Sequence, residues 1–271
     1  MAIHKTEGII LSSADWSESS QTLHIFTPDL GKITLNVKGS RRLNGKRGRP
    51  LRFARLEFSC YLKEGSESGY LSDVEPVEVF LFEKDGQLGR LTFASGAIEL
   101  LNNLLTAHDP QPACYQITLS FLRMTDAVEK KRLPGLFAGY ILRLISLLGY
   151  RPNLSGCVGC GKAAGEISGT ATPERLLFSV ERGGIICDNC RRTMPGDIAL
   201  LGLSRELHDL MVRLMASSLE EASRILIGMK ELTQVVEIVT TLLRFHAGTV
   251  KHLKTFDFLD KLIRAVEANG G

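Results

Sequence analysis

The spacing of apolar residues changes near residue 85, and this change is the strongest constraint on how the chain can fold. Before it, apolar and polar residues alternate. Ile33, Leu35 and Val37 face one way if the segment 33–38 is extended, and 53–62 repeats the pattern. A period of two is typical of half-buried strands, whereas the later spacing of three and four is typical of helices. The sequence therefore predicts an α+β chain with strands first and helices afterwards.

Five candidate strands fall within the first 82 residues, joined by short turns and one long loop. Small barrels are built this way, and a five-stranded Greek-key barrel of the OB type binds nucleic acid across one face and its loops. An SH3-like barrel would show a similar pattern, so both topologies stay open at this point. The alternation places Cys60 in the barrel core. The candidate strands are 5–13, 21–27, 33–38, 53–62 and 69–80.

Helical spacing covers most of the remaining chain, with Pro112 and Pro134 as breaks between the first segments. Ser218 and Glu221 have capping-box spacing, and Gly248 follows the last segment as a C-terminal cap would. The most apolar stretch, 133–150, contains an arginine and is short for a membrane span, so we expect a buried helix. The expected helices are 89–109, 114–131, 134–150, 204–218, 218–232 and 231–248.

Two CxxC pairs lie between the helical segments: Cys157 with Cys160, and Cys187 with Cys190. Four thiolates held on two tight turns suit tetrahedral zinc, and four protein ligands indicate a closed structural site instead of a catalytic one. The spacer of 26 residues exceeds the roughly 15 to 20 usual for this pattern, although 178–186 can form a hairpin within it. Reduced thiols without metal and a redox dithiol are the alternatives.

Positive charge is concentrated between residues 38 and 55, where eight Lys and Arg occur without an acidic residue. The formal net charge is only +3, so the rest of the chain carries −5. A local basic patch is therefore predicted, either for nucleic acid or as a solvated loop. Phe26 and Trp16 are candidates for stacking on bases, though each could instead cover the barrel end or pack against the helices.

Signatures of common enzyme classes are missing from the sequence. It has no GxxxxGK[ST] phosphate loop, no GxGxxG after a strand, no HExxH and no GxSxG. We therefore predict a protein that is not an enzyme. No secretory signal is found at the start, and six cysteines without one indicate a reducing compartment, so we expect a cytoplasmic protein without a membrane segment.

Three separate motifs resemble the RecO family of bacterial recombination mediators. They are EGIILSSADWSESSQTLHIFTPDLGKITLNVKGSRR near the start, LLGYRPNLSGCVGCG with GGIICDNC in the middle, and KHLKTFDFLDKL near the end. They occur in the family's order over the whole chain. The resemblance implies four segments: an OB-fold nucleic-acid-binding domain (1–82), a helical domain in two parts (83–153 and 197–271), and an inserted zinc finger (154–196).

The resemblance also implies a function. RecO-like proteins bind single- and double-stranded DNA, anneal complementary strands, and act with RecR and the C-terminal tail of single-stranded DNA-binding protein (SSB) to load RecA during repair. They work at the nucleoid in the cytoplasm, and their zinc is structural. A helical region with Leu122, Arg123 and the run Lys130, Lys131 and Arg132 would suit the SSB tail. Lys38, Arg41 and Arg42 match the family's basic segment, and we add Lys46, Arg47 and Arg49 on charge alone.

Two other functions fit the same residues. A zinc-ribbon factor that binds RNA or acts in transcription would use the same barrel and cysteines, and would prefer RNA through its 2′-hydroxyls. A protein adaptor would use the basic loop for an acidic partner, and its partner binding would persist where DNA binding is absent. Competition between RNA and DNA of one sequence separates the first alternative from the DNA-binding interpretation.

Overall fold

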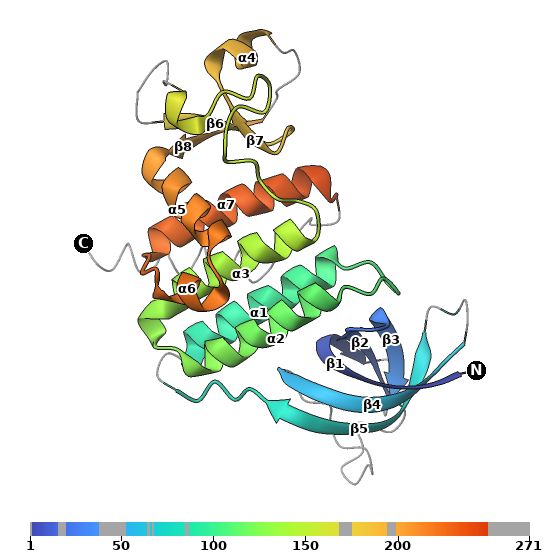
Figure 1. Ribbon diagram of the computed structural model, residues 1–271. Helices are drawn as coiled ribbons and strands as arrows, with labels where there is room; N and C mark the ends of the chain where they lie inside the picture. Colours follow the sequence, from blue (N-terminus) through green and yellow to red (C-terminus); the bar gives the residue numbers. More distant parts are fainter. Residues whose placement is uncertain are drawn as a thin grey trace. The chain divides into compact units, whose positions relative to one another are not determined.

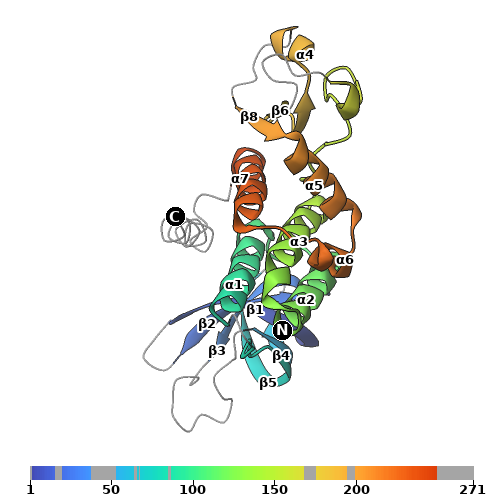
Figure 2. The ribbon, with the colours of Figure 1, turned by 90° about the vertical axis from the view of Figure 1, so that its left-hand side faces the viewer.

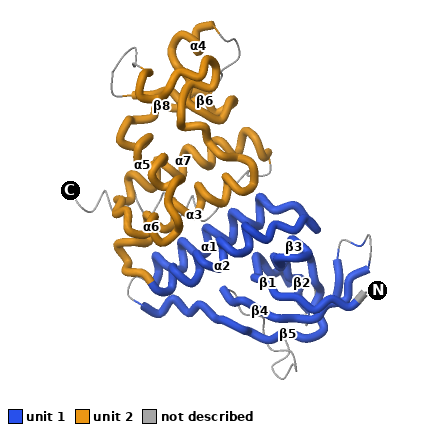
Figure 3. Tube along the Cα trace, viewed as in Figure 1, with its two compact units in different colours: residues 1–127 blue, residues 128–271 orange. Residues whose placement is uncertain are grey.

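The structure is a computed structural model that describes residues 2–15, 20–37, 53–63, 66, 68–84, 87–167, 175–193 and 199–248. It divides into two compact units, Met1–Ala127 and Val128–Gly271 (Figure 3). The first unit holds a five-stranded barrel and two helices, and the second holds further helices and a small sheet. The predicted α+β class is confirmed.

The first unit begins with a closed barrel in the strand order β1-β2-β3-β5-β4 (Figure 1). Neighbouring strands pair antiparallel, except that β3 and β5 pair in parallel through Leu35–Gly69 and Asn36–Tyr70. This is the five-stranded barrel of OB type that the sequence predicts. Its strands are β1 (Ala2–Asp15), β2 (Gln21–Thr27), β3 (Gly31–Val37), β4 (Ala54–Leu62) and β5 (Gly69–Val79).

The barrel interior is filled by the apolar halves of the alternating strands. Ile33, Leu35 and Val37 of β3 are buried while the residues between them are partly exposed, which confirms the predicted faces. Cys60 of β4 is also in this core, and burial followed by the nearby Asp29 carboxylate raises the pKa of its thiol to about 11. Removing apolar side chains from water contributes roughly 25 cal/mol per Å² to folding, so strand alternation is what stabilises the barrel.

Two helices, α1 (Gln87–Leu104) and α2 (Pro112–Ala127), complete the first unit and pack on β1 and β2. The buried Arg90 of α1 donates a hydrogen bond to the carbonyl of Thr125, which joins the two helices. Lys32 Nζ of the barrel donates to the Asn102 carbonyl at 2.8 Å, and the His108 N–H donates to the Lys32 carbonyl at 3.0 Å. Barrel and helices therefore share polar contacts as well as apolar ones.

The second unit is built around α3 (Leu133–Leu147), a helix that is buried along most of its length. This confirms the predicted buried helix, and no helix among the described residues is long and apolar enough to cross a membrane. Residue 139 of α3 is a glycine. A Cβ there would collide with the Ala222 side chain of α6, so the glycine allows the two helices to approach closely. The surrounding helices are η1 (Lys130–Arg132), α5 (Arg205–Ala216), α6 (Leu219–Arg224) and α7 (Met229–His246).

The helix boundaries differ most from the sequence prediction at the end of α6, while α1 ends at Leu104 and α2 at Ala127, a few residues earlier than predicted. The capping box of Ser218 and Glu221 is present and starts α6, and Gly248 has the positive φ of a C-terminal cap. However, the helix expected over 218–232 ends at Arg224, because Ile225 is extended and leads through Gly228 into α7. The carbonyls of Ala222 and Ile225 lie against Gly135 of α3, so tertiary packing interrupts a pattern that is locally helical.

A small antiparallel sheet with strand order β7-β6-β8 lies at one end of the helices in the second unit (Figure 2). Its strands are β6 (Arg175–Ser179), β7 (Gly184–Ile186) and β8 (Leu200–Ser204), and η2 (Ala164–Glu166) and α4 (Asp188–Thr193) flank it. His246 Nε2 lies 2.8 Å from the Val180 carbonyl, and His208 Nε2 lies 2.9 Å from the Leu154 carbonyl. These contacts attach the sheet region to α7 and α5.

The turn between β2 and β3 gives a direct test of the fold. Gly31 has a φ of +68°, and a Cβ there would meet the backbone of Asp109. We expect Gly31→Ala to lower the free energy of unfolding by at least about 1 kcal/mol, because of the left-handed backbone and this collision. Gly89→Ala is the matched control, since Gly89 lies in α1 with open space around it. This variant should be at least as stable as the unchanged protein. Urea unfolding curves of both variants check this, and equal midpoints would contradict it.

Candidate nucleic-acid interface and metal centre

The basic stretch predicted to contact nucleic acid lies outside the described residues. The described residues end at Val37, the last residue of β3, and begin again at Phe53, one residue before β4. The stretch is therefore the connection between two barrel strands. The contacts assigned to it stay a prediction. The residues concerned are Lys38, Arg41, Arg42, Lys46, Arg47 and Arg49, and Trp16 is likewise outside the described ranges.

Phe26 is not available to stack on a base. Its ring is fully buried and meets Tyr115 of α2 edge-on, with ring centroids 5.6 Å apart. It does point away from the barrel core, but α2 covers it, so Ile25, Phe26 and Thr27 are buried in succession. The stacking role predicted for Phe26 is wrong, and the alternative that it packs against the helices is confirmed.

The outer face of β2 and β3 carries small polar side chains that bond across the strands. Thr22 Oγ1 donates to Asn36 Oδ1 at 2.9 Å, and His24 Nδ1 lies 3.1 Å from Thr34 Oγ1. Burial, followed by the charge of Lys32, lowers the pKa of His24, so the neutral ring is favoured on this face. The described part of this face therefore offers hydrogen bonds but neither an exposed ring nor an added cation from His24.

The side chains on the outer face of β1, β4 and β5 change from apolar to acidic along the strands. At one end, strand pairing aligns Ile3, Tyr61 and Tyr70, all exposed. Further along, Glu57 pairs with Glu7 on one side and Glu75 on the other, so three carboxylates lie in one row. Like charges opposite each other on neighbouring strands repel, which makes this row unfavourable for phosphates as well.

Two arginines near the acidic row are already paired. Arg55 Nη1 donates to Glu7 Oε2 at 2.6 Å, and Arg123 makes bonds of 2.7 and 2.8 Å to both carboxylate oxygens of Glu78. The hydrogen bond from Arg123, only partly offset by burial, lowers the pKa of Glu78. Both guanidinium groups are therefore engaged with carboxylates of the barrel.

The side chains suggested for the SSB tail are only partly accessible. Leu122 is fully buried in α2, so it offers no open surface for a peptide, whereas the Arg123 side chain is 46% exposed and pairs with Glu78. In the other unit, Lys131 pairs with Glu129 at 2.9 Å, as expected of a solvated turn. The structure therefore contradicts the part of the assignment that rests on Leu122, and the remainder stays a prediction.

The backbone of the small sheet region brings the two CxxC turns together. The predicted hairpin is confirmed, because β6 and β7 pair through Leu177–Ile186 and Phe178–Ile185. β7 leads directly to Cys187, and the Val158 N–H donates to the Ile185 carbonyl at 2.8 Å, which fastens the first CxxC turn to the same strand. The long spacer between the pairs therefore folds back on itself and does not separate them.

The four sulfur atoms of Cys157, Cys160, Cys187 and Cys190 all lie within 4.8 Å of one another. The Sγ atoms of Cys160 and Cys187 are 3.8 Å apart, close to the separation of two thiolates bound to one ion at about 2.3 Å. The backbone N–H groups of Gly159 and Cys187 point at the Cys157 sulfur, at 3.4 and 3.3 Å. The donor set and its geometry fit a tetrahedral metal ion.

The pKa values of two of these thiols are shifted in opposite directions. Burial opposes charge on Cys157, but the N–H groups of Cys187, Cys160 and Gly159 outweigh it and lower the pKa of this thiol to about 6. Burial, and then hydrogen bonds with the neighbouring cysteines, raise the pKa of Cys190. At neutral pH one thiolate is therefore ready for a cation, while Cys190 must release a proton to become a ligand.

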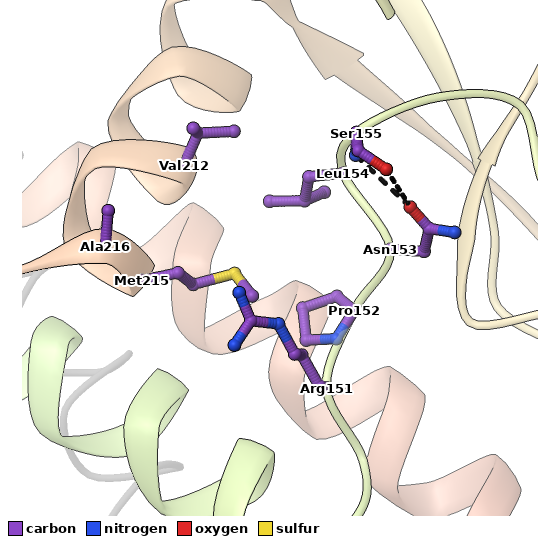
Figure 4. A pocket seen from close by; sticks show the side chains of 8 residues that line it. All are labelled: Arg151, Pro152, Asn153, Leu154, Ser155, Val212, Met215 and Ala216. Atoms are coloured by element: carbon purple, nitrogen blue, oxygen red, sulfur yellow. Dashed lines mark hydrogen bonds between the residues drawn. The ribbon is translucent and has the colours of Figure 1, made fainter. Parts of the chain in front are cut away.

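A separate pocket of about 460 Å³ opens between α5 and the chain that follows α3 (Figure 4). Leu154 points across it toward Val212, and the Arg151 side chain extends toward Met215. Its walls are mainly apolar and its charge comes from one guanidinium. Such a pocket suits an apolar group beside a carboxylate. The lining residues are Arg151, Pro152, Asn153, Leu154, Ser155, Val212, Met215 and Ala216.

Family comparisons cover both parts of the chain. Residues 1–80 match the family described as Recombination protein O N terminal, and residues 86–255 match Recombination protein O C terminal. The chain belongs to the RecO family. It is thus a member of a family of DNA repair and recombination proteins, as its motifs indicate.

Curated RecO relatives align over nearly their full length. The chain is 27% identical to the DNA repair protein RecO of Symbiobacterium thermophilum, over 97% of this chain and 98% of the relative. It is 31% identical to the protein of that name from Rubrobacter xylanophilus, over 83% and 89%. With RecO of Anaeromyxobacter dehalogenans the identity is 27%, over 95% and 96%. The likeness therefore extends over the barrel, the helices and the segment that contains the four cysteines.

The metal centre of this RecO chain can be tested by removing one ligand. We expect Cys160→Ser to abolish stoichiometric metal binding, because three thiolates and a hydroxyl bind a soft ion far more weakly. Cys114→Ser is the control, since Cys114 is buried in α2 outside the cluster. Elemental analysis of purified protein gives the metal content. Binding should also weaken as the pH falls, because Cys190 must lose a proton. Equal metal content in both variants would contradict the assignment.

Proposed function

We propose that this protein is a recombination mediator that binds single- and double-stranded DNA and anneals complementary strands. With RecR, it would help to load RecA onto single strands coated by SSB. The observation that carries the proposal is the match to both RecO family models. It makes the closed barrel at the start of the chain the N-terminal domain of a DNA repair protein, and two strands of that barrel are connected by the basic stretch.

DNA capture rests on the basic stretch. Lys38, Arg41, Arg42, Lys46, Arg47 and Arg49 are the proposed phosphate contacts. The described part of the barrel supports this choice indirectly, because its outer face carries an acidic row and its Arg55 is bound to Glu7. Neutralising phosphates releases counterions, so affinity should fall steeply as salt rises. Holding two backbones on one positive surface would also reduce their mutual repulsion during annealing. No covalent bond is made or broken in this function.

The metal at the four cysteines is proposed to be structural zinc. Zinc favours four thiolates at tetrahedral positions and has no redox chemistry of its own. Here it would join the first CxxC turn to the end of the β6–β7 hairpin, and so hold the region proposed as a zinc finger, 154–196. Its contribution is to the folding of the finger and not to chemistry on DNA.

The partners of the proposed function are DNA, RecR and the C-terminal tail of SSB, with RecA acted on indirectly. These partners rest on the resemblance to RecO proteins. The same resemblance supports a location at the nucleoid in the cytoplasm and the domain limits 1–82, 83–153, 154–196 and 197–271. The apolar pocket beside Arg151 has chemistry that a peptide ending in an apolar residue would match.

The salt dependence of DNA binding tests the basic stretch. We expect Arg41→Ala with Arg42→Ala to weaken binding to all sequences and to reduce the slope of log affinity against log salt by about 1 to 2. The reason is that each phosphate that is no longer neutralised lowers the slope by roughly one unit or slightly less. Fluorescence anisotropy with a single-stranded oligonucleotide across a salt series measures both quantities.

The matched control is Lys130→Ala with Lys131→Ala, which removes two adjacent cations from a turn in the second unit. Its slope should equal that of the unchanged protein. If the Arg41 and Arg42 variant kept the original slope, these residues would not be phosphate contacts. If the unchanged protein failed to bind at low salt, DNA binding itself would be refuted.

A further inference from the structure

Three exposed apolar side chains form a row across the barrel that DNA capture by the basic stretch does not use. Ile3 of β1 pairs with Tyr61 of β4, and Tyr61 pairs with Tyr70 of β5. Their exposed fractions are 65%, 37% and 39%. Within the described part of the barrel, no other aromatic ring has a comparable exposure. The row therefore exposes apolar and aromatic surface on the outside of the barrel.

Strand alternation fixes the direction of these side chains. Cys60 and Leu71, which neighbour the two tyrosines along their strands, are buried in the barrel core, so Tyr61 and Tyr70 face outward. Directly paired residues on adjacent strands have Cβ atoms about 5 Å apart, so the three side chains make one continuous strip over three strands. A strip of this kind has the planar, apolar surface on which unpaired bases stack.

Two exposed lysines lie near the row. Lys5 follows Ile3 by two residues on the outer face of β1, and Lys63 comes directly after the last residue of β4; both are exposed. The acidic row of Glu7, Glu57 and Glu75 lies further along the strands. Lys63 therefore lies beyond the row at the end of β4, whereas Lys5 and the exposed Asp73, which flank Ser59, lie between the row and these carboxylates.

The row also lies where the chain enters the basic stretch. Tyr70 pairs in parallel with Asn36 of β3, and β3 ends one residue later at Val37. Figure 1 shows the start of β1 beside the end of β4 and the start of β5. The proposed phosphate contacts therefore begin, along the chain, two residues after the partner of Tyr70.

We propose that Ile3, Tyr61 and Tyr70 form a base-stacking subsite for single-stranded DNA on the outer face of β1, β4 and β5. The inference rests on the proposed DNA binding and adds a second kind of contact to it. The basic stretch holds phosphates of either DNA form, whereas these rings bind bases that are not already stacked in a duplex. The row thus favours single strands over duplexes of the same charge.

The test compares two oligomers of equal length and charge: oligothymidylate, and an abasic deoxyribose phosphate chain that keeps the phosphates and lacks the bases. Full-length protein should bind oligothymidylate more tightly, by about 5- to 150-fold for each base stacked. Tyr61→Ala with Tyr70→Ala should lose most of that preference while its affinity for the abasic chain and its salt slope stay unchanged. Tyr61→Phe with Tyr70→Phe keeps the rings and should keep the preference.

Each outcome separates the subsite from DNA binding as such. Equal affinity of the unchanged protein for both oligomers would overturn the subsite and leave phosphate binding intact. A preference that persists in the alanine variant would also overturn it, because the bases would then be held elsewhere, and the row would be left for a protein partner. Loss of the preference in the phenylalanine variant would overturn stacking as its cause. Absence of binding to either oligomer would refute the proposed function on which the subsite rests.

Discussion

The short parallel pairing between β3 and β5 is the contact on which the first unit depends. It comprises only Leu35–Gly69 and Asn36–Tyr70, yet it converts a curved sheet into a closed barrel without free edges at this point. Space is tight at Gly69, where a Cβ would collide with the Tyr61 carbonyl and the Leu62 side chain of β4 and press on Leu35 of β3. Closure shields the barrel core from water and fixes which residues neighbour the outward-facing Tyr70.

The two candidate sites depend on the fold in different ways. On the barrel, the strands supply a rigid frame, and charge is supplied mainly by a connection between two strands. In the proposed zinc finger, the site and the local fold depend on each other, because the four cysteines lie on segments that the β6–β7 hairpin brings together. Loss of a bound metal ion should therefore disturb this region more than the barrel, since the barrel has its own hydrophobic core.

Much of the barrel and the metal cluster could be predicted from the sequence, because local patterns encode them. Alternation indicates the buried faces of β3 and β4, and two CxxC pairs around a hairpin indicate the cluster. Alternation also places Phe26 outside the core, but it does not say that α2 covers the ring. It places Tyr61 on an outer face, whereas strand order and register decide that Ile3 and Tyr70 flank it. The local signal that could have indicated this row is an outward-facing aromatic residue near the end of one strand, Tyr61, and another near the start of the next strand, Tyr70.

The strand order also has a consequence for how the protein reaches its native state. β1–β2, β2–β3 and β4–β5 join strands that follow one another along the chain, whereas β1–β4 and β3–β5 bring distant segments together. Closing long loops costs entropy before contacts repay it, so the hairpins should form early and the two distant pairings late. The row of Ile3, Tyr61 and Tyr70 requires the β1–β4 pairing. A chain that is still folding would therefore have its basic residues from the start but acquire its aromatic surface only in the last step.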